Sequence, residues 1–142
     1  MTPKNPLTFG DITVGMARES DYEITPQVYR SFLDTFNDRS PVHVDDAHAR
    51  SQGFEGLVMH GAILNGFLSN FIGMVFPGAN TLELSVEIRF LKPCYLGDKL
   101  RMRGEVAQKL VAANVVLLHV SYQNLTQGTL AANGRVQVKI TA

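Results

Sequence analysis

Hydrophobic residues recur at helical spacing in the first half of the chain and at strand spacing in the second half. In the segment ITPQVYRSFLDTFND the apolar residues fall on one helical face, while Thr25 suits the N-cap and Pro26 the first helical position. This pattern predicts a helix from Pro26 to about Phe36 or Asn37, so that the residues after Asn37 form its C-terminal end or the following loop.

Two further helical patterns follow. The segment VDDAHARSQG predicts a short helix capped by Asp45 and ended by Gly53, after a non-helical link SPVH, because Pro41 disfavours helical backbone at Ser40. The segment HGAILNGFLSNFIGMVFPG is apolar nearly all round, as is typical of a buried helix, and it predicts one over residues 61–76.

Beyond this helix the apolar residues alternate with polar ones, which is the spacing of half-buried strands. The alternation predicts four strands, separated by the turn segments KPCYLGD and NLTQGT, and the opening LTFGDITVGM resembles a short strand and turn. Helices followed by an antiparallel meander define an α+β protein in which the sheet curls around a buried central helix. The predicted strands are Leu82–Phe90, Leu100–Leu110, Val116–Tyr122 and Val136–Ile140.

Composition narrows the class of protein. The 142 residues predict a single domain, 1–142, with a sizeable core, and the 13 basic and 13 acidic residues argue against a nucleic-acid partner. A single cysteine, Cys94, excludes an intramolecular disulfide and any multi-cysteine metal site. The start MTPKNPLTFGD lacks the pattern of a signal peptide, and the longest apolar run is too short and too interrupted to cross a membrane. We therefore expect a soluble, cytoplasmic protein with no membrane partner.

The candidate chemistry centres on the segment FNDRSPVHVDDAHA, where Asp38 precedes His43 by five residues. Taken alone, the two residues also fit a solvated turn carboxylate and an ordinary hydrogen-bonded histidine. Their neighbourhood favours catalysis, because His60 is followed by Gly61 at the start of the apolar helix. A glycine there leaves a main-chain N–H uncovered at the positive end of the helix dipole, where it can hold an oxyanion. A base, an acid and an oxyanion donor suit proton abstraction next to a carbonyl.

The remaining ionisable residues give weaker indications. His60 also fits a structural role at the entry to the buried helix, and we interpret His48 and His119 as bystanders. No metal site is predicted, since the HExxH and CxxC spacings are absent, and no phosphate-binding glycine loop is present. A modest basic cluster fits either a solvated face or contacts to the phosphates of a pantetheine-linked ligand. It comprises Lys92, Lys99, Arg101 and Arg103.

Three segments in register resemble the MaoC-like dehydratases and R-specific enoyl-CoA hydratases: FNDRSPVHVDDAHA, GLVMHGAIL and LELSVEIRFLKPCYLGDKL. The resemblance implies a hot-dog fold and a homodimer or dimer of dimers with clefts at the subunit interface. It also implies that Asp38 and His43 form the catalytic pair, that the N–H of Gly61 polarises a thioester carbonyl, and that His60 and Ser40 belong to the substrate site. The implied reaction is reversible hydration of trans-2-enoyl thioesters, of CoA or acyl carrier protein, to (R)-3-hydroxyacyl thioesters without a metal or redox cofactor.

Three positions depart from the family pattern and leave two alternatives open. Ser40 replaces an asparagine, Asn37 replaces a glycine, and Gly66 replaces a serine that bonds the catalytic aspartate. Ser40 and Gly66 favour a non-catalytic module that binds acyl thioesters. A hot-dog thioesterase is the other alternative, although residues 61–76 contain no Asp or Glu to serve as its carboxylate. We also expect Asp38, if it lies in an apolar cleft, to have a raised pKa.

Overall fold

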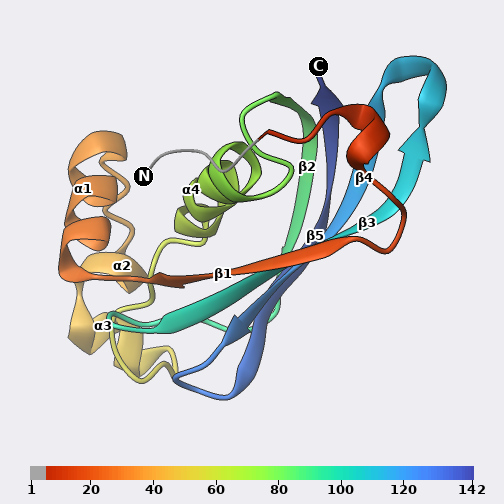
Figure 1. The fold of residues 1–142 in the computed structure, drawn as a ribbon. Coiled ribbons are helices and arrows are strands. Elements are labelled where there is room, and N and C mark those ends of the chain that lie inside the picture. The colour runs from red at the N-terminus through yellow and green to blue at the C-terminus, as the bar shows by residue number, and fades with distance from the viewer. Residues whose placement is uncertain (1–5) are drawn as a thin grey trace.

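The computed structural model describes residues 6–142, in which a curved five-stranded antiparallel sheet wraps around a central helix (Figure 1). Residues 1–5, part of the start that carried the signal-peptide argument, lie outside the described residues. The strand order is β1-β3-β4-β5-β2, so β1 and β2 are the two edges. The strands are β1 (Ala17–Glu23), β2 (Thr81–Phe90), β3 (Lys99–Leu110), β4 (Val115–Asn124) and β5 (Thr129–Ile140).

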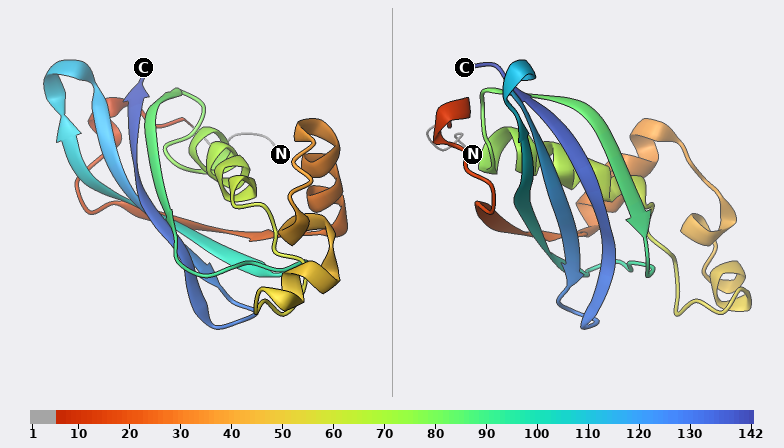
Figure 2. Two further views of the ribbon diagram at one scale, coloured as in Figure 1. Left: turned by 180° about the vertical axis from the view of Figure 1, so that it is seen from behind. Right: turned by 90° about the vertical axis from the view of Figure 1, so that its right-hand side faces the viewer.

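The helices lie on the concave side of the sheet and at one end of it, as the two views in Figure 2 show. Their predicted starts are confirmed: the side chain of Thr25 accepts the N–H of Val28, and that of Asp45 accepts the N–H of His48. The elements are α1 (Pro26–Phe36), α2 (Pro41–Val44), α3 (Asp46–Ser51), α4 (Ala62–Asn70), the 3-10 turns η1 (Phe9–Asp11) and η3 (Val111–Ala113), and the π turn η2 (Phe71–Val75). The π turn continues α4, so the predicted central helix is present with its last turns widened.

The structure corrects several local predictions. The prediction that SPVH is non-helical is wrong for most of the segment. Pro41 occupies the first position of α2, and only Ser40 stays outside the helix. The opening segment forms η1 rather than a strand. Strand β1 was not predicted, since its sequence ARESDYE carries few apolar residues for an edge strand to display. The sheet is a meander only over β3, β4 and β5; β2 crosses to pair with β5.

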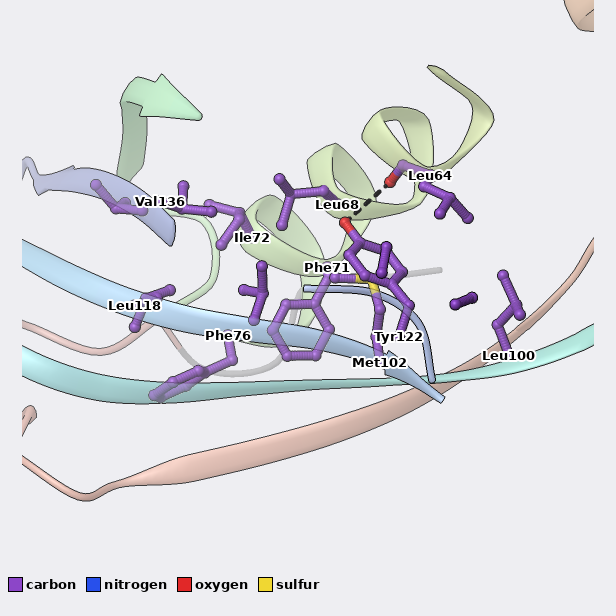
Figure 3. Packing of buried hydrophobic residues seen from close by; sticks show 14 of the residues in the cluster. Leu64, Leu68, Phe71, Ile72, Phe76, Leu100, Met102, Leu118, Tyr122 and Val136 are labelled. Carbon is purple, nitrogen blue, oxygen red and sulfur yellow. Dashed lines mark hydrogen bonds between the residues drawn. The ribbon is translucent and has the colours of Figure 1, made fainter. Parts of the chain in front are cut away.

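The core fills the space between α4 and the concave face of the sheet (Figure 3). Leu68, Phe71 and Ile72 project from the helix layer and are at most 2% exposed. Full burial of such side chains stabilises the fold by roughly 1.5–3 kcal/mol each. Tyr122 of β4 donates its hydroxyl hydrogen to the carbonyl of Leu64, 3.2 Å away, which fixes the helix against the sheet by a polar contact as well. Burial raises the pKa of Tyr122, so the phenol stays protonated as a donor.

A bulge in β2 changes which of its side chains face the helix. Glu83 pairs with buried Val138, but Ser85 pairs with the next residue of β5, so Leu84 is extra. The bulge reverses the alternation, and Leu82 therefore leaves the face that the simple pattern predicted for it. Leu82 and Leu84 are 57% and 50% exposed. Glu83 takes the inward position instead, where partial burial raises its pKa although the residue stays exposed in the single chain.

The described helices are each too short or too polar to cross a lipid bilayer.

Candidate active site

The candidate catalytic loop begins where α1 ends. Asn37 adopts a left-handed conformation with φ of 55°, and its N–H bonds the carbonyl of Leu33 to close the helix. Glycine favours this conformation most and asparagine tolerates it, which explains how Asn37 stands where the family pattern has glycine. The turn ends α1 directly before Asp38.

Ser40 holds the carboxylate of Asp38 from two sides. Its hydroxyl and its main-chain N–H both donate to Oδ1 of Asp38, over 2.6 Å and 3.1 Å. The side-chain hydrogen bond contributes most, the main-chain bond adds to it, and together they hold the pKa of Asp38 below its ordinary value. The expected rise is therefore wrong in direction, because the Asp38 side chain is 47% exposed in the single chain rather than enclosed by apolar groups.

The main-chain carbonyl of Val58 orients the ring of His43, and a tyrosine holds its main chain. Its Nδ1 lies 2.7 Å from the carbonyl oxygen of Val58, which can only accept, so Nδ1 carries the hydrogen and Nε2 keeps its lone pair when the ring is neutral. Tyr29 donates its hydroxyl hydrogen to the carbonyl of His43, 2.6 Å away. The sequence analysis missed both partners. Val58 acts through its main chain, which leaves no mark in the sequence, and Tyr29 looked like an ordinary position on α1.

Asp38 and His43 face each other across a gap suited to one water molecule. Nε2 of His43 lies 3.7 Å from Oδ2 of Asp38. This distance is too long for a direct hydrogen bond, and with a neutral His43 ring it brings two acceptors together. A water oxygen about 2.8 Å from both atoms can donate one hydrogen to each. The pair therefore has the geometry to hold and orient a single water molecule.

Gly61 supplies an open amide next to this pair. It precedes α4, and among residues 6–142 no acceptor pairs with its N–H. A side chain at this position would bring Cβ within 3.1 Å of the ring of Phe90, so glycine keeps the approach to the amide clear. An unpaired N–H at the start of a helix suits a developing negative charge on oxygen.

A cavity of about 520 Å³ reaches both His43 and Gly61. Its other walls are mainly apolar, and the strand-to-loop segment Phe90–Cys94 forms one of them. The central helix lines the cavity only near its N-terminal end, as far as Leu64. Asp38 does not line the cavity in the single chain and stands beside it, next to His43.

His60 brings a third ionisable side chain to the site. One potential ligand atom from each of Asp38, His43 and His60 lies within 4.8 Å of the others, a spacing that also occurs in metal sites. However, Nε2 of His60 lies 2.8 Å from the main-chain oxygen of Asp38 and must carry a hydrogen to bond it. Since a metal ligand must offer a lone pair, this nitrogen cannot bind a cation while the bond exists.

The basic residues do not form one positive patch. Arg101 pairs with Asp21, and Arg103 contacts Glu105 and Glu19, so acidic neighbours offset both charges. Lys92 alone of the predicted cluster lines the cavity. The cluster is therefore largely a solvated outer face of the sheet, and Lys92 is its one member that lines the cavity.

Comparisons with known proteins agree with the fold. Residues 11–127 match the MaoC like domain family, and the chain belongs to this family of hydratases and dehydratases. It is 28% identical to an (R)-specific enoyl-CoA hydratase of Aeromonas caviae, over 78% of this chain and 81% of that protein. It is also 28% identical to a 3-hydroxybutyryl-CoA dehydratase of Methylorubrum extorquens, over 72% of this chain and 65% of that protein. The match therefore spans slightly less than two thirds of the dehydratase.

An R-hydratase from Pseudomonas aeruginosa, solved without ligand, superposes on this chain with a TM-score of 0.86 at 29% identity. The superposition covers 95% of this chain and 86% of that one. The predicted hot-dog fold, a sheet wrapped around a long central helix, is thereby confirmed.

Proposed function

We propose that this protein is a hydro-lyase that adds water reversibly to trans-2-enoyl thioesters and forms (R)-3-hydroxyacyl thioesters. The observation that carries the proposal is the facing pair of acceptors, Nε2 of His43 and Oδ2 of Asp38, 3.7 Å apart beside the open amide of Gly61. The names of the relatives in A. caviae and M. extorquens support the same reaction class. The mainly apolar walls of the cavity suit an acyl chain.

In the proposed reaction, Asp38 and His43 each accept one hydrogen of the water. The lowered pKa of Asp38 makes its carboxylate a weak base at neutral pH, whereas an imidazole is suited to proton exchange there. His43 therefore takes a proton as the water oxygen bonds C3 of the substrate. The electron pair of the C2–C3 double bond moves toward the thioester oxygen, which the N–H of Gly61 stabilises. The imidazolium of His43 then donates the same proton to C2, and dehydration follows the reverse path.

Asp38 has a second task in this scheme. While His43 carries the proton, the ionised carboxylate 3.7 Å away stabilises the positive ring. Ser40 fixes the carboxylate in this orientation through its two hydrogen bonds. The serine thus supplies support that the family pattern assigns to asparagine, and this weighs against the reading of the chain as a module that only binds thioesters.

We also propose that two copies of the chain assemble along β2. This edge strand leaves Val86 and Phe90 41% and 55% exposed, although both point to the helix side of the sheet. An uncovered apolar edge strand favours pairing with another strand. Phe90 lines the cavity as well, so a second copy placed on β2 would complete one of its walls. Sedimentation velocity should give twice the mass of the chain, and a monomer at micromolar concentration would overturn this assembly.

The reaction is tested with crotonyl-CoA and longer enoyl-CoA substrates. We expect a loss of enoyl absorbance for the purified protein, (R)-3-hydroxyacyl-CoA as product, and no release of free thiol. Release of thiol would instead support the thioesterase alternative, and tight binding without turnover would support the binding module. Equal rates for the wild type and for His43→Ala on every substrate would refute the lyase proposal.

A further inference from the structure

His60 contacts both residues to which the reaction has been assigned. It is 3% exposed, and its ring stacks on that of His43 with centroids 4.0 Å apart and planes inclined by 28°. Phe32 packs on the ring from α1, with centroids 4.7 Å apart, and Tyr29 lies further off at 5.9 Å. The imidazole of His60 is therefore packed between aromatic rings, and one of these is the ring of His43, the proposed proton carrier.

The hydrogen bonds of His60 determine its tautomer. Nε2 donates to the main-chain oxygen of Asp38 across 2.8 Å. Nδ1 is sealed from solvent, and within residues 6–142 it has no hydrogen-bond partner. Adding a proton to Nδ1 would bury an N–H without an acceptor, which is unfavourable. The neutral ring of His60 therefore carries its hydrogen on Nε2.

We propose that His60 is a positioning residue that keeps three parts of the site in register. Nε2 at the edge of its ring binds the main-chain oxygen of Asp38, and the face of the ring stacks on His43. Gly61 is the next residue in the chain, so the position of His60 also fixes the start of the oxyanion amide. One side chain thus contacts the main chain of Asp38 and the ring of His43, and its residue adjoins the oxyanion amide of Gly61. The consequence for turnover rests on the proposed function, whereas the placement of Asp38 and His43 can be measured independently of it.

Two substitutions separate the contacts of this ring. His60→Gln retains an N–H donor for the oxygen of Asp38 but removes the aromatic face beneath His43. His60→Phe retains the face but removes the donor. Small displacements of reacting groups reduce rates by up to about 100-fold, so we expect each variant to lose roughly 10–100-fold in kcat with KM changed by no more than about two-fold. The same two substitutions at exposed His119 serve as the matched control and should leave both constants unchanged.

The experiment combines these kinetics with NMR of protein carrying ¹⁵N-labelled histidine. In the wild type, we expect the ring of His60 to carry hydrogen on Nε2. In His60→Phe the carboxyl ¹³C resonance of Asp38 should move, and in His60→Gln the ring resonances of His43 should move. A purely structural role would lower the melting temperature and the folded fraction but leave kcat per folded molecule unchanged.

Three results would overturn the proposal: hydrogen on Nδ1 of His60, unchanged Asp38 and His43 resonances in the variants, or unchanged kcat per folded molecule. If one variant does not fold, the other variant and the tautomer of His60 in the wild type still test the positioning role. If the wild type turns over no enoyl thioester, the proposed function fails, and the resonances alone test the positioning role.

Discussion

The core beneath α4 and the loop beside its start are stabilised in different ways. The core consists of side chains such as Leu68 and Phe71, at most 1% exposed, whose packing is spread over many contacts. The catalytic loop is half exposed at Asp38 and depends on a few hydrogen bonds, most of which involve main-chain groups. The comparison teaches that most of the fold stability lies away from the catalytic pair, although core residues such as Leu64 also line the cavity. Substitutions deep in the core should leave the chemistry of the pair largely unchanged, and substitutions in the loop should affect stability only slightly.

The largest expected effect on stability comes from the core. Leu68→Ala removes buried methyl groups and leaves a cavity, so we expect a loss of about 2–5 kcal/mol in the free energy of unfolding. Leu125→Ala is the matched control, because this leucine is 43% exposed in the turn between β4 and β5. Urea denaturation measures both, and activity per folded molecule should stay unchanged in each. A stable Leu68→Ala protein with impaired turnover would break the comparison.

Two glycine substitutions test the comparison of core and loop further, with smaller expected changes in the free energy of unfolding. At Gly134 in β5 an added Cβ would lie 1.9 Å from the main-chain oxygen of Glu87, so β5 and β2 would have to separate. We expect Gly134→Ala to cost about 1–3 kcal/mol, the range for overpacked sites. At Gly66 in α4 an added Cβ meets nothing within 4 Å.

Gly66→Ala should therefore stabilise the helix by about 0.5–1 kcal/mol, because alanine favours helical backbone over glycine. Thermal and urea unfolding of the two variants provide the test. A Gly134→Ala protein as stable as the wild type would contradict the close approach of the strands.

The smallest effect concerns the loop. Ser40→Ala removes the stronger of the two serine donors, so the pKa of Asp38 should rise toward its ordinary value. A depressed pKa contributes stability above the ordinary value, and this contribution is lost as the pH falls through the lowered value. The stability difference between wild type and variant should therefore be present at neutral pH and vanish in stronger acid. Carboxyl ¹³C NMR measures the pKa directly, Ser40→Thr is the conservative control, and an unchanged pKa in Ser40→Ala would exclude the serine as its cause.

The sequence predicted the fold class because long periodic segments dominate it, as at the helix that starts after Thr25 and at the apolar central helix. The sequence did not predict β1, because an edge strand can form with few apolar residues. It also assigned Leu82 to the wrong face of the sheet, because a bulge changes the register locally and the alternation of residues does not reveal it. At the site, spacing brought attention to Asp38 and His43 but not to the acceptor at Val58, which is a main-chain atom. The direction of the Asp38 pKa was also beyond the sequence, since it depends on how far Ser40 folds back.

The central claim is that Asp38 and His43 act together on one water molecule. A double-mutant cycle in kcat/KM for crotonyl-CoA hydration tests it most directly, with Asp38→Asn, His43→Ala and the combined variant. Each single change should cost about 10²–10⁴-fold, the usual contribution of acid–base catalysis. Because residues that work as a unit are not additive, the combined variant should be about as slow as the slower single variant. A combined loss equal to the product of the two single losses would show that the residues act independently and would contradict the account.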